Sequence, residues 1–306
     1  MAIYTGEINK MNIFDGHCHI KCDENLEKNI IALKKEMMVN KINKAVLFAD
    51  PFVDEFKCIN STEKEFHYCH TTDQFNINND LSIKCDVCNK IIYHGNDPFN
   101  EYNKMLFNKV DDEMFDLFLL LSVSNKTINK NIDEFCNLYG DKVKGLKLYT
   151  GLSDLVLNDL DEIKSNLPLI IHTGKPFNQT PQNMINFLKK YKGYIVLAHY
   201  ARFNPEIVEL VKKSDNIYVD TSPSYYIYMN YLSNEKKCGL FDYNNISCPE
   251  DLYYKAIELY GIDKIIFGSD YPFSNLSDEI SLLNNLKLSD DEYKKIAYKN
   301  LMKVLK

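Results

Sequence analysis

The sequence is almost free of arginine: among its 36 basic residues, Arg202 is the only arginine. It has no block of basic residues and a formal net charge of -7, so nucleic acid is not expected as a partner. No apolar run is long enough to span a bilayer, and residues 1–10 lack the apolar core of a signal peptide. These absences predict a cytoplasmic protein that acts away from membranes.

Disulfide bonds are also not expected, although the chain contains nine cysteines. With 306 residues, of which 45% are hydrophobic, the chain can bury a substantial core without disulfide support. We therefore expect the cysteines to be buried or to bind metal.

Hydrophobic runs alternate with helical patterns about eight times, which predicts an α/β fold. The predicted strands span 12–16, 44–49, 116–122, 144–149, 168–172, 194–199, 216–220 and 264–269. The predicted helices span 25–40, 98–110, 128–139, 158–165, 181–191, 204–213, 249–260 and 277–304. Eight such units favour a (β/α)8 TIM barrel over an open sheet, and we expect residues 1–306 to form one domain.

Two stretches interrupt this alternation, and each follows the end of a predicted strand. Residues 51–97 form an insertion rich in cysteine and histidine after the second strand, and residues 221–248 are rich in tyrosine. Barrel enzymes build their active sites at this end of the strands, so both stretches are expected to border the site.

Metal-binding side chains end several of the predicted strands. The first strand runs into Asp15-Gly16-His17-Cys18-His19, and because side chains alternate along a strand, its two histidines face the same side. His172, His199 and Asp270 each end a later hydrophobic run. Since parallel strand ends converge on one rim of a barrel, these groups can meet there and predict a catalytic metal.

The order of these motifs resembles the amidohydrolase superfamily, and most closely its amidohydrolase-related branch, which includes metal-dependent decarboxylases of the aminocarboxymuconate-semialdehyde type. Each motif is weak alone, but their order is specific and spans nearly the whole chain outside the two interrupting stretches. The residues that carry the resemblance are Phe14-Asp15-Gly16-His17-Cys18-His19, Lys144-Gly145-Leu146-Lys147-Leu148, Ile171-His172-Thr173-Gly174, Leu197-Ala198-His199 and Phe267-Gly268-Ser269-Asp270-Tyr271-Pro272-Phe273.

The resemblance implies that His17, His19, His172 and Asp270 hold one divalent metal, with His199 near its open coordination position. Imidazoles and a carboxylate suit Zn²⁺ best, with Mn²⁺, Fe²⁺ or Co²⁺ as alternatives. The metal would lower the pKa of a bound water towards about 7. Asp270 would accept the proton of that water, and His199 would polarise the substrate or shuttle the proton.

Two basic residues are further candidates for the site. Lys147 has the parity of a side chain that points into the barrel, where it would contact substrate or, once carbamylated, bridge two metals as in other branches of the superfamily. Arg202 lies three residues after His199, and its planar fork suits an anionic group of the substrate. A structural ion pair is the alternative for Arg202.

The insertion contains a pattern that predicts a second, structural Zn²⁺. Cys85 and Cys88 form a Cys-x-x-Cys pair, and Cys69, His67 and His70 lie 15 to 18 residues before the first of these two cysteines. A metal would stabilise a segment with few large aliphatic residues. A loop with incidental cysteines, or a redox dithiol, remains an alternative.

The sequence therefore predicts a metal-dependent hydrolase that cleaves a C–N or C–O bond of a small, anionic substrate. A non-oxidative decarboxylase on the same scaffold is the first alternative, because it would use the same ligands. An inactive barrel that serves as a binding module is the second. The sequence leaves the oligomeric state open; a homodimer is the candidate assembly, because related barrels often dimerise.

Overall fold

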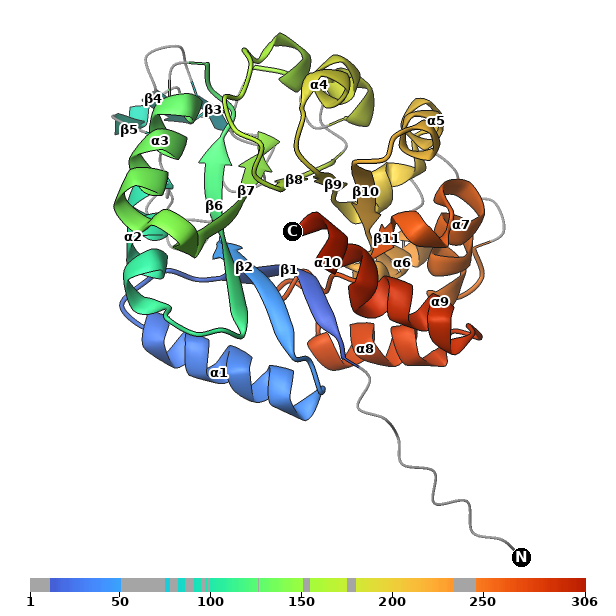
Figure 1. The fold of residues 1–306 in the computed structure, drawn as a ribbon. Coiled ribbons are helices and arrows are strands. Elements are labelled where there is room, and N and C mark those ends of the chain that lie inside the picture. The colour runs from blue at the N-terminus through green and yellow to red at the C-terminus, as the bar shows by residue number, and fades with distance from the viewer. Residues whose placement is uncertain are drawn as a thin grey trace, which may run out of the picture.

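The computed structural model describes residues 12–50, 75–77, 82–85, 91–94, 97, 99–125, 127–150, 155–174, 180–233 and 246–306. Eight parallel strands form a nearly closed barrel, and most of the helices lie around its outside (Figure 1). Their order around the barrel follows the chain: β1 (Phe14–Ile20), β2 (Lys44–Ala49), β6 (Phe115–Ser122), β7 (Val143–Tyr149), β8 (Leu169–Ile171), β9 (Ile195–Leu197), β10 (Ile217–Asp220) and β11 (Ile265–Ile266). The predicted TIM barrel is confirmed.

The helices cover the sheet as the alternating pattern predicts. They are α1 (Leu26–Val39), α2 (Asn100–Lys109), α3 (Ile128–Tyr139), α4 (Ile185–Lys190), α5 (Pro205–Lys213), α6 (Ser224–Ser233), α7 (Glu250–Tyr260), α8 (Leu276–Asn285), α9 (Asp290–Lys294) and α10 (Asn300–Val304). Because strands of such a barrel are buried on both faces, they consist of nearly continuous hydrophobic runs. No helix in the described ranges has the length and apolar character needed to cross a membrane.

The inside of the barrel is filled by side chains from alternate strand positions. Val46, Phe48, Phe118, Ile170 and Val196 are buried there. The last helix, α10, packs against the same cluster and lies near the centre of the ring in Figure 1. It therefore closes the end of the barrel at which the strands begin, and leaves the other end for chemistry.

The barrel closes between β1 and the segment that follows β11. The Gly16 N–H donates to Phe267 O (2.8 Å), Asp270 N–H to His17 O (2.8 Å) and His19 N–H to Tyr271 O (2.7 Å). A Cβ on Gly16 would lie 3.0 Å from that Phe267 oxygen, so glycine permits the close approach. This seam places Asp270 beside both histidines of β1.

Residues 158–165 do not form the predicted helix; apart from a short 3-10 turn, this stretch has no regular secondary structure. Side-chain amides form hydrogen bonds with its backbone N–H groups: Asn125 Oδ1 accepts from Asp161 N (2.6 Å) and Asn129 Oδ1 accepts from Lys164 N (2.8 Å). These backbone donors are satisfied without a helix, so the apolar periodicity of the segment does not decide its structure.

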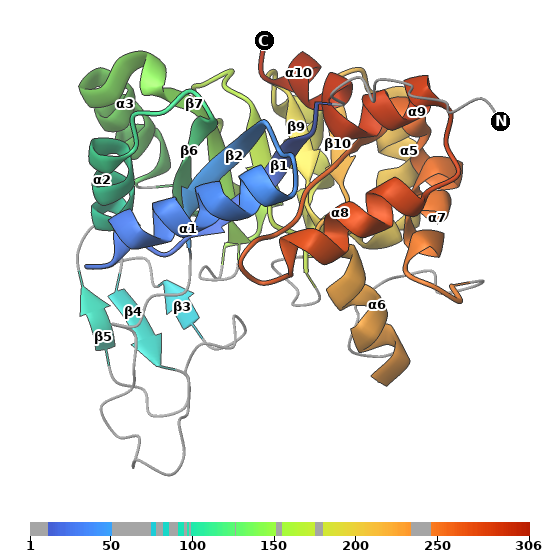
Figure 2. The same cartoon turned by 90° about the horizontal axis from the view of Figure 1, so that it is seen from below.

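The predicted helix over 277–304 is interrupted, because Ser289 and Glu292 form a capping box that starts α9. Helix α6 arises within the tyrosine-rich stretch, where no helix was predicted. The insertion contains an antiparallel sheet of β3 (Phe75–Ile77), β4 (Ser82–Cys85) and β5 (Ile91–His94). Figure 2 shows this sheet and α6 on the same side of the barrel.

Candidate metal centre

The barrel mouth brings together three of the four predicted metal ligands. His17 Nε2 and His19 Nε2 lie 3.3 Å apart, and each lies 3.2 Å from Asp270 Oδ1. All three residues are buried, and they come from the closing seam between β1 and the segment after β11. The three atoms therefore form a nearly equilateral triangle.

This triangle fits a divalent cation. A tetrahedral ion with bonds of about 2.0 Å holds its ligand atoms about 3.3 Å apart, which matches the separations above. The donor set of two imidazoles and one carboxylate suits Zn²⁺ or a neighbouring transition metal. Within the described chain, His19 Nδ1 is buried and has no hydrogen-bond partner, so its only contacts of this kind are made through Nε2.

Rings and charges around the triangle hold the ligands in place. Phe48 meets the His19 ring edge to face at 4.5 Å between centroids. Burial lowers the pKa of His19 to about 4, so this ring is neutral and able to ligate. Burial raises the pKa of Asp270, but His17, His19 and His199 together lower it more, so that the pKa of Asp270 is well below its ordinary value.

His172, the fourth predicted ligand, contacts His199 instead of the triangle. His199 Nε2 lies 3.1 Å from His172 Nδ1, and the His199 ring lies 5.4 Å from the His17 ring between centroids. Burial lowers the pKa of His199 well below 6.5. The predicted catalytic histidine is thus a neutral ring beside the triangle, with His172 behind it.

Lys147 points into the barrel, as its strand parity predicts. It is fully buried, its Nζ lies 3.1 Å from His17 Nε2, and it stands 4.7 Å above the Phe48 ring. Burial lowers the pKa of Lys147 to about 8. A cationic side chain therefore competes for the same imidazole nitrogen that a metal would use.

Arg202 lies at the same rim, in an unusual backbone segment. The five residues from His199 to Phe203 all have positive φ, between 44° and 58°, although none is glycine. A left-handed turn of this kind costs roughly 1–2 kcal/mol per residue, and strain of this kind gathers at functional sites. The turn directs Arg202 Nε and Nη2 to Thr173 O, at 3.1 and 2.9 Å.

Asp220 belongs to this site, and sequence reasoning missed it. It ends β10 and is fully buried, and its Oδ2 accepts from His17 Nδ1 at 2.7 Å. The sequence pattern that predicts Asp270, an acid at the end of a buried apolar strand, is also present at Asp220. The strand predicted over 216–220 contributes only to the fold prediction, however, so Asp220 is not among the predicted site residues.

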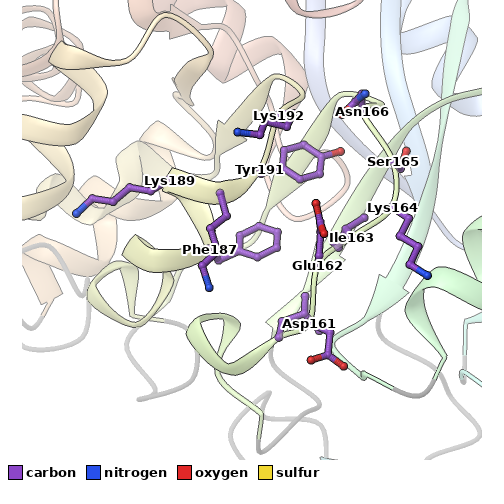
Figure 3. Close-up of a pocket in the computed structure, with 12 residues that line it drawn as sticks. Asp161, Glu162, Ile163, Lys164, Ser165, Asn166, Phe187, Lys189, Tyr191 and Lys192 are labelled. Atoms are coloured by element: carbon purple, nitrogen blue, oxygen red, sulfur yellow. The ribbon is translucent and has the colours of Figure 1, made fainter.

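A cleft of about 920 Å³ lies elsewhere, between residues 160–166 and 187–192 (Figure 3). These segments precede β8 and β9, so the cleft lies at the end of the strands opposite the metal-binding triangle. In Figure 3 Lys164 and Lys189 point in opposite directions and converge on no common point. Residues 160–165, which form no helix, line one side of the cleft.

The predicted structural zinc falls mostly outside the described residues. Cys85 ends strand β4, whereas His67, Cys69, His70 and Cys88 lie in ranges that the structure does not describe. The structural Zn²⁺ therefore stays a prediction.

Known proteins resemble this chain in fold. A 5-carboxyvanillate decarboxylase from Sphingomonas paucimobilis aligns with a TM-score of 0.60 and 11% identity, covering 96% of this chain and 99% of the other. A candidate 2-pyrone-4,6-dicarboxylic acid hydrolase from Pseudomonas putida aligns at 0.57 and 12%, covering 96% and 97%. A dihydroxybenzoic acid decarboxylase from Polaromonas, with bound manganese and the inhibitor 2-nitroresorcinol, aligns at 0.58 and 12%, covering 96% of each.

Sequence comparison covers less of the chain. No curated protein matches it, whereas the family model described as amidohydrolase matches residues 163–306. That range contains His172, His199, Asp220 and Asp270, the residues from the later strand ends. The resemblance to amidohydrolases that the strand-end motifs predict is therefore confirmed over residues 163–306 by the family match, and the solved structures share the fold of the barrel.

Proposed function

We propose that the protein is a metal-dependent hydrolase of a small, anionic substrate. The observation that carries this proposal is the triangle of His17 Nε2, His19 Nε2 and Asp270 Oδ1 at 3.2–3.3 Å, in the mouth of the barrel. We propose these three residues as ligands, with His172 as the fourth, and Zn²⁺ or Mn²⁺ as the ion. A bound cation would supply Lewis acidity and lower the pKa of a water to about 7.

The residues around the triangle supply the remaining chemistry. His199 is a neutral ring beside the triangle, with its Nε2 hydrogen-bonded to His172, so it can accept or return a proton during the reaction. Asp270 Oδ1 holds the two β1 histidines together, and its carboxylate can take the first proton from water. Each of these roles needs only short movements of protons between groups at one rim.

The substrate class follows from the cations at the rim. Arg202 is held through Thr173 O in the turn that begins at His199, and Lys147 stands inside the barrel. A carboxylate on the substrate would meet these charges near the reacting centre. A carbamylated Lys147 bridging two metals is the competing role for that residue.

Decarboxylation is the second candidate, since two of the solved relatives are decarboxylases of aromatic acids. It requires the same triangle and the same anion-binding groups. The difference lies in what leaves: carbon dioxide in one case, and the product of C–N or C–O cleavage in the other.

One experiment tests both. The protein is stripped with a chelator, reloaded separately with Zn²⁺, Mn²⁺, Fe²⁺ or Co²⁺, and assayed on lactones, amides and carboxylated aromatics for hydrolysis and for carbon dioxide release. Activity should vanish on stripping and return with one metal per chain. Absence of stoichiometric metal from the reloaded wild type would contradict the proposal.

A further inference from the structure

The carboxylate of Asp220 contacts two parts of the site at once. Oδ2 lies 2.7 Å from His17 Nδ1. Oδ1 accepts three hydrogen bonds, from the backbone N–H of His199 (2.9 Å), the N–H of Ser222 (3.1 Å) and the Ser222 hydroxyl (2.8 Å). Because a carboxylate only accepts hydrogen bonds, each of these partners is a donor.

These contacts fix the tautomer of His17. Its Nδ1 carries the proton, because it faces the Asp220 carboxylate. Its other nitrogen, Nε2, faces Lys147 Nζ at 3.1 Å, and an ammonium group only donates. Lys147 therefore favours a lone pair on Nε2, whereas Asp270 Oδ1, 3.2 Å away, is an acceptor for the same nitrogen when no metal is bound. With the Nδ1 proton held by Asp220, a cation in the triangle would meet the Nε2 lone pair, as a metal ligand requires.

The same carboxylate fixes His199 through Ser222. The Ser222 carbonyl oxygen lies 2.8 Å from His199 Nδ1, and since a carbonyl only accepts, Nδ1 carries the proton. The lone pair is then on Nε2. His172 Nδ1, at 3.1 Å, must donate to it, which leaves the lone pair of His172 on Nε2. Any ligation by His172 in this arrangement uses Nε2.

We propose that Asp220 is a shared positioning residue, which sets the tautomers of the ligand His17 and the proton carrier His199 together. This role rests on the proposed function for its purpose, but the tautomers themselves do not. One carboxylate then makes one nitrogen of each ring available for metal binding or for proton transfer.

The Asp220→Asn substitution tests this positioning role. The amide has the same shape as the carboxylate, but one of its two ends accepts hydrogen bonds and the other donates them. Three donors face the Oδ1 position, so the amide oxygen stays there and the NH₂ group faces His17 Nδ1. That group donates and opposes a proton on Nδ1, although Ser222 Oγ also lies 3.1 Å from this nitrogen. We therefore expect His17 to accept on Nδ1 and to carry its proton on Nε2, where Asp270 Oδ1 is the acceptor. The proton then points into the triangle and opposes the metal.

The first measurement is made on metal-free protein labelled with ¹⁵N-histidine, which has seven histidines to assign. Long-range ¹H–¹⁵N spectra of the wild type should show His17 and His199 protonated on Nδ1. In Asp220→Asn, His17 should move its proton to Nε2 while His199 keeps Nδ1. A wild-type His17 protonated on Nε2 but not on Nδ1 overturns the inference, even if the variant fails to fold.

The second measurement is Mn²⁺ affinity by titration calorimetry. Asp220→Asn should weaken binding about 10- to 100-fold. The control is Asp116→Asn, which alters another buried strand carboxylate, ion-paired to Lys44 at 2.8 Å and remote from the rim; its affinity should equal that of the wild type. Equal affinities in both variants overturn the positioning role. Expected tautomers in a wild type that binds no metal support it, and only the proposed function then falls.

Discussion

A single methyl group on Gly268 should separate His17 from the groups that position it. Gly268 follows β11, and a Cβ placed there would lie 2.9 Å from His17 Cβ, 3.3 Å from Ser222 Cβ and 3.5 Å from Asp220 Cβ. The optimal van der Waals separation of two non-bonded carbon atoms is about 3.5–4.0 Å. The new methyl group of Gly268→Ala therefore pushes the proposed ligand His17 away from its hydrogen-bond partner Asp220.

The expected magnitude follows from these distances. His17 must retreat by at least about 0.6 Å to restore an ordinary carbon contact, and overpacking of this size costs about 1–3 kcal/mol of folding stability. A binding site tolerates displacements of only about 0.5 Å. We therefore expect Mn²⁺ affinity to fall by at least about tenfold, along with the free energy of unfolding.

Urea denaturation and calorimetric metal titration measure the two effects separately. Gly140→Ala is the matched control: Gly140 has φ of +53° with open space around the new methyl, so it loses about 1–2 kcal/mol through backbone strain alone. Its metal affinity should stay at the wild-type value. If Gly268→Ala loses stability but keeps that affinity too, the contact with His17 does not position the site.

Four further substitutions test individual roles. Asp270→Asn should abolish turnover and weaken metal binding while changing the urea midpoint little, because the two side chains have the same shape; undiminished turnover would exclude its catalytic role. His172→Ala should lower the metal content found by elemental analysis, and unchanged content would count against ligation. Lys147→Met should strengthen metal binding by removing a competing cation 3.1 Å from His17 Nε2; a fall from two metals per chain to one would instead identify a carbamate bridge. Arg202→Lys should raise KM for an anionic substrate by about tenfold or more, since one charged hydrogen bond of about 1.5–3 kcal/mol to Thr173 O is lost, and a KM equal to that of the wild type would remove the clamp.

The barrel was predictable because its strands leave a strong local signal. Runs such as 117–121 and 194–198 are hydrophobic throughout, and Asn204 caps α5, accepting from Glu206 N and Ile207 N. The absent helix over 158–165 was not predictable, because amides more than 30 residues earlier in the chain satisfy its backbone. Long-range side-chain contacts of this kind carry no periodicity.

The site shows the same division between local and distant information. Histidine and aspartate at strand ends were visible in the sequence, and the closing seam brings three of them within 3.3 Å. The pairing of His172 with His199, and the contact of Asp220 with His17 over 203 positions, depend on ring orientation and strand register. Neither can be read from spacing.

The seam between β1 and the segment after β11 has a consequence for biosynthesis. The histidines of β1 leave the ribosome early, but Asp270 emerges some 250 residues later, so a nascent chain holds an incomplete set of ligands for most of its synthesis. An ion that binds only the finished triangle would favour the folded state by mass action. Metal would then bind last, and would stabilise only those chains in which β1 has already paired with the segment after β11.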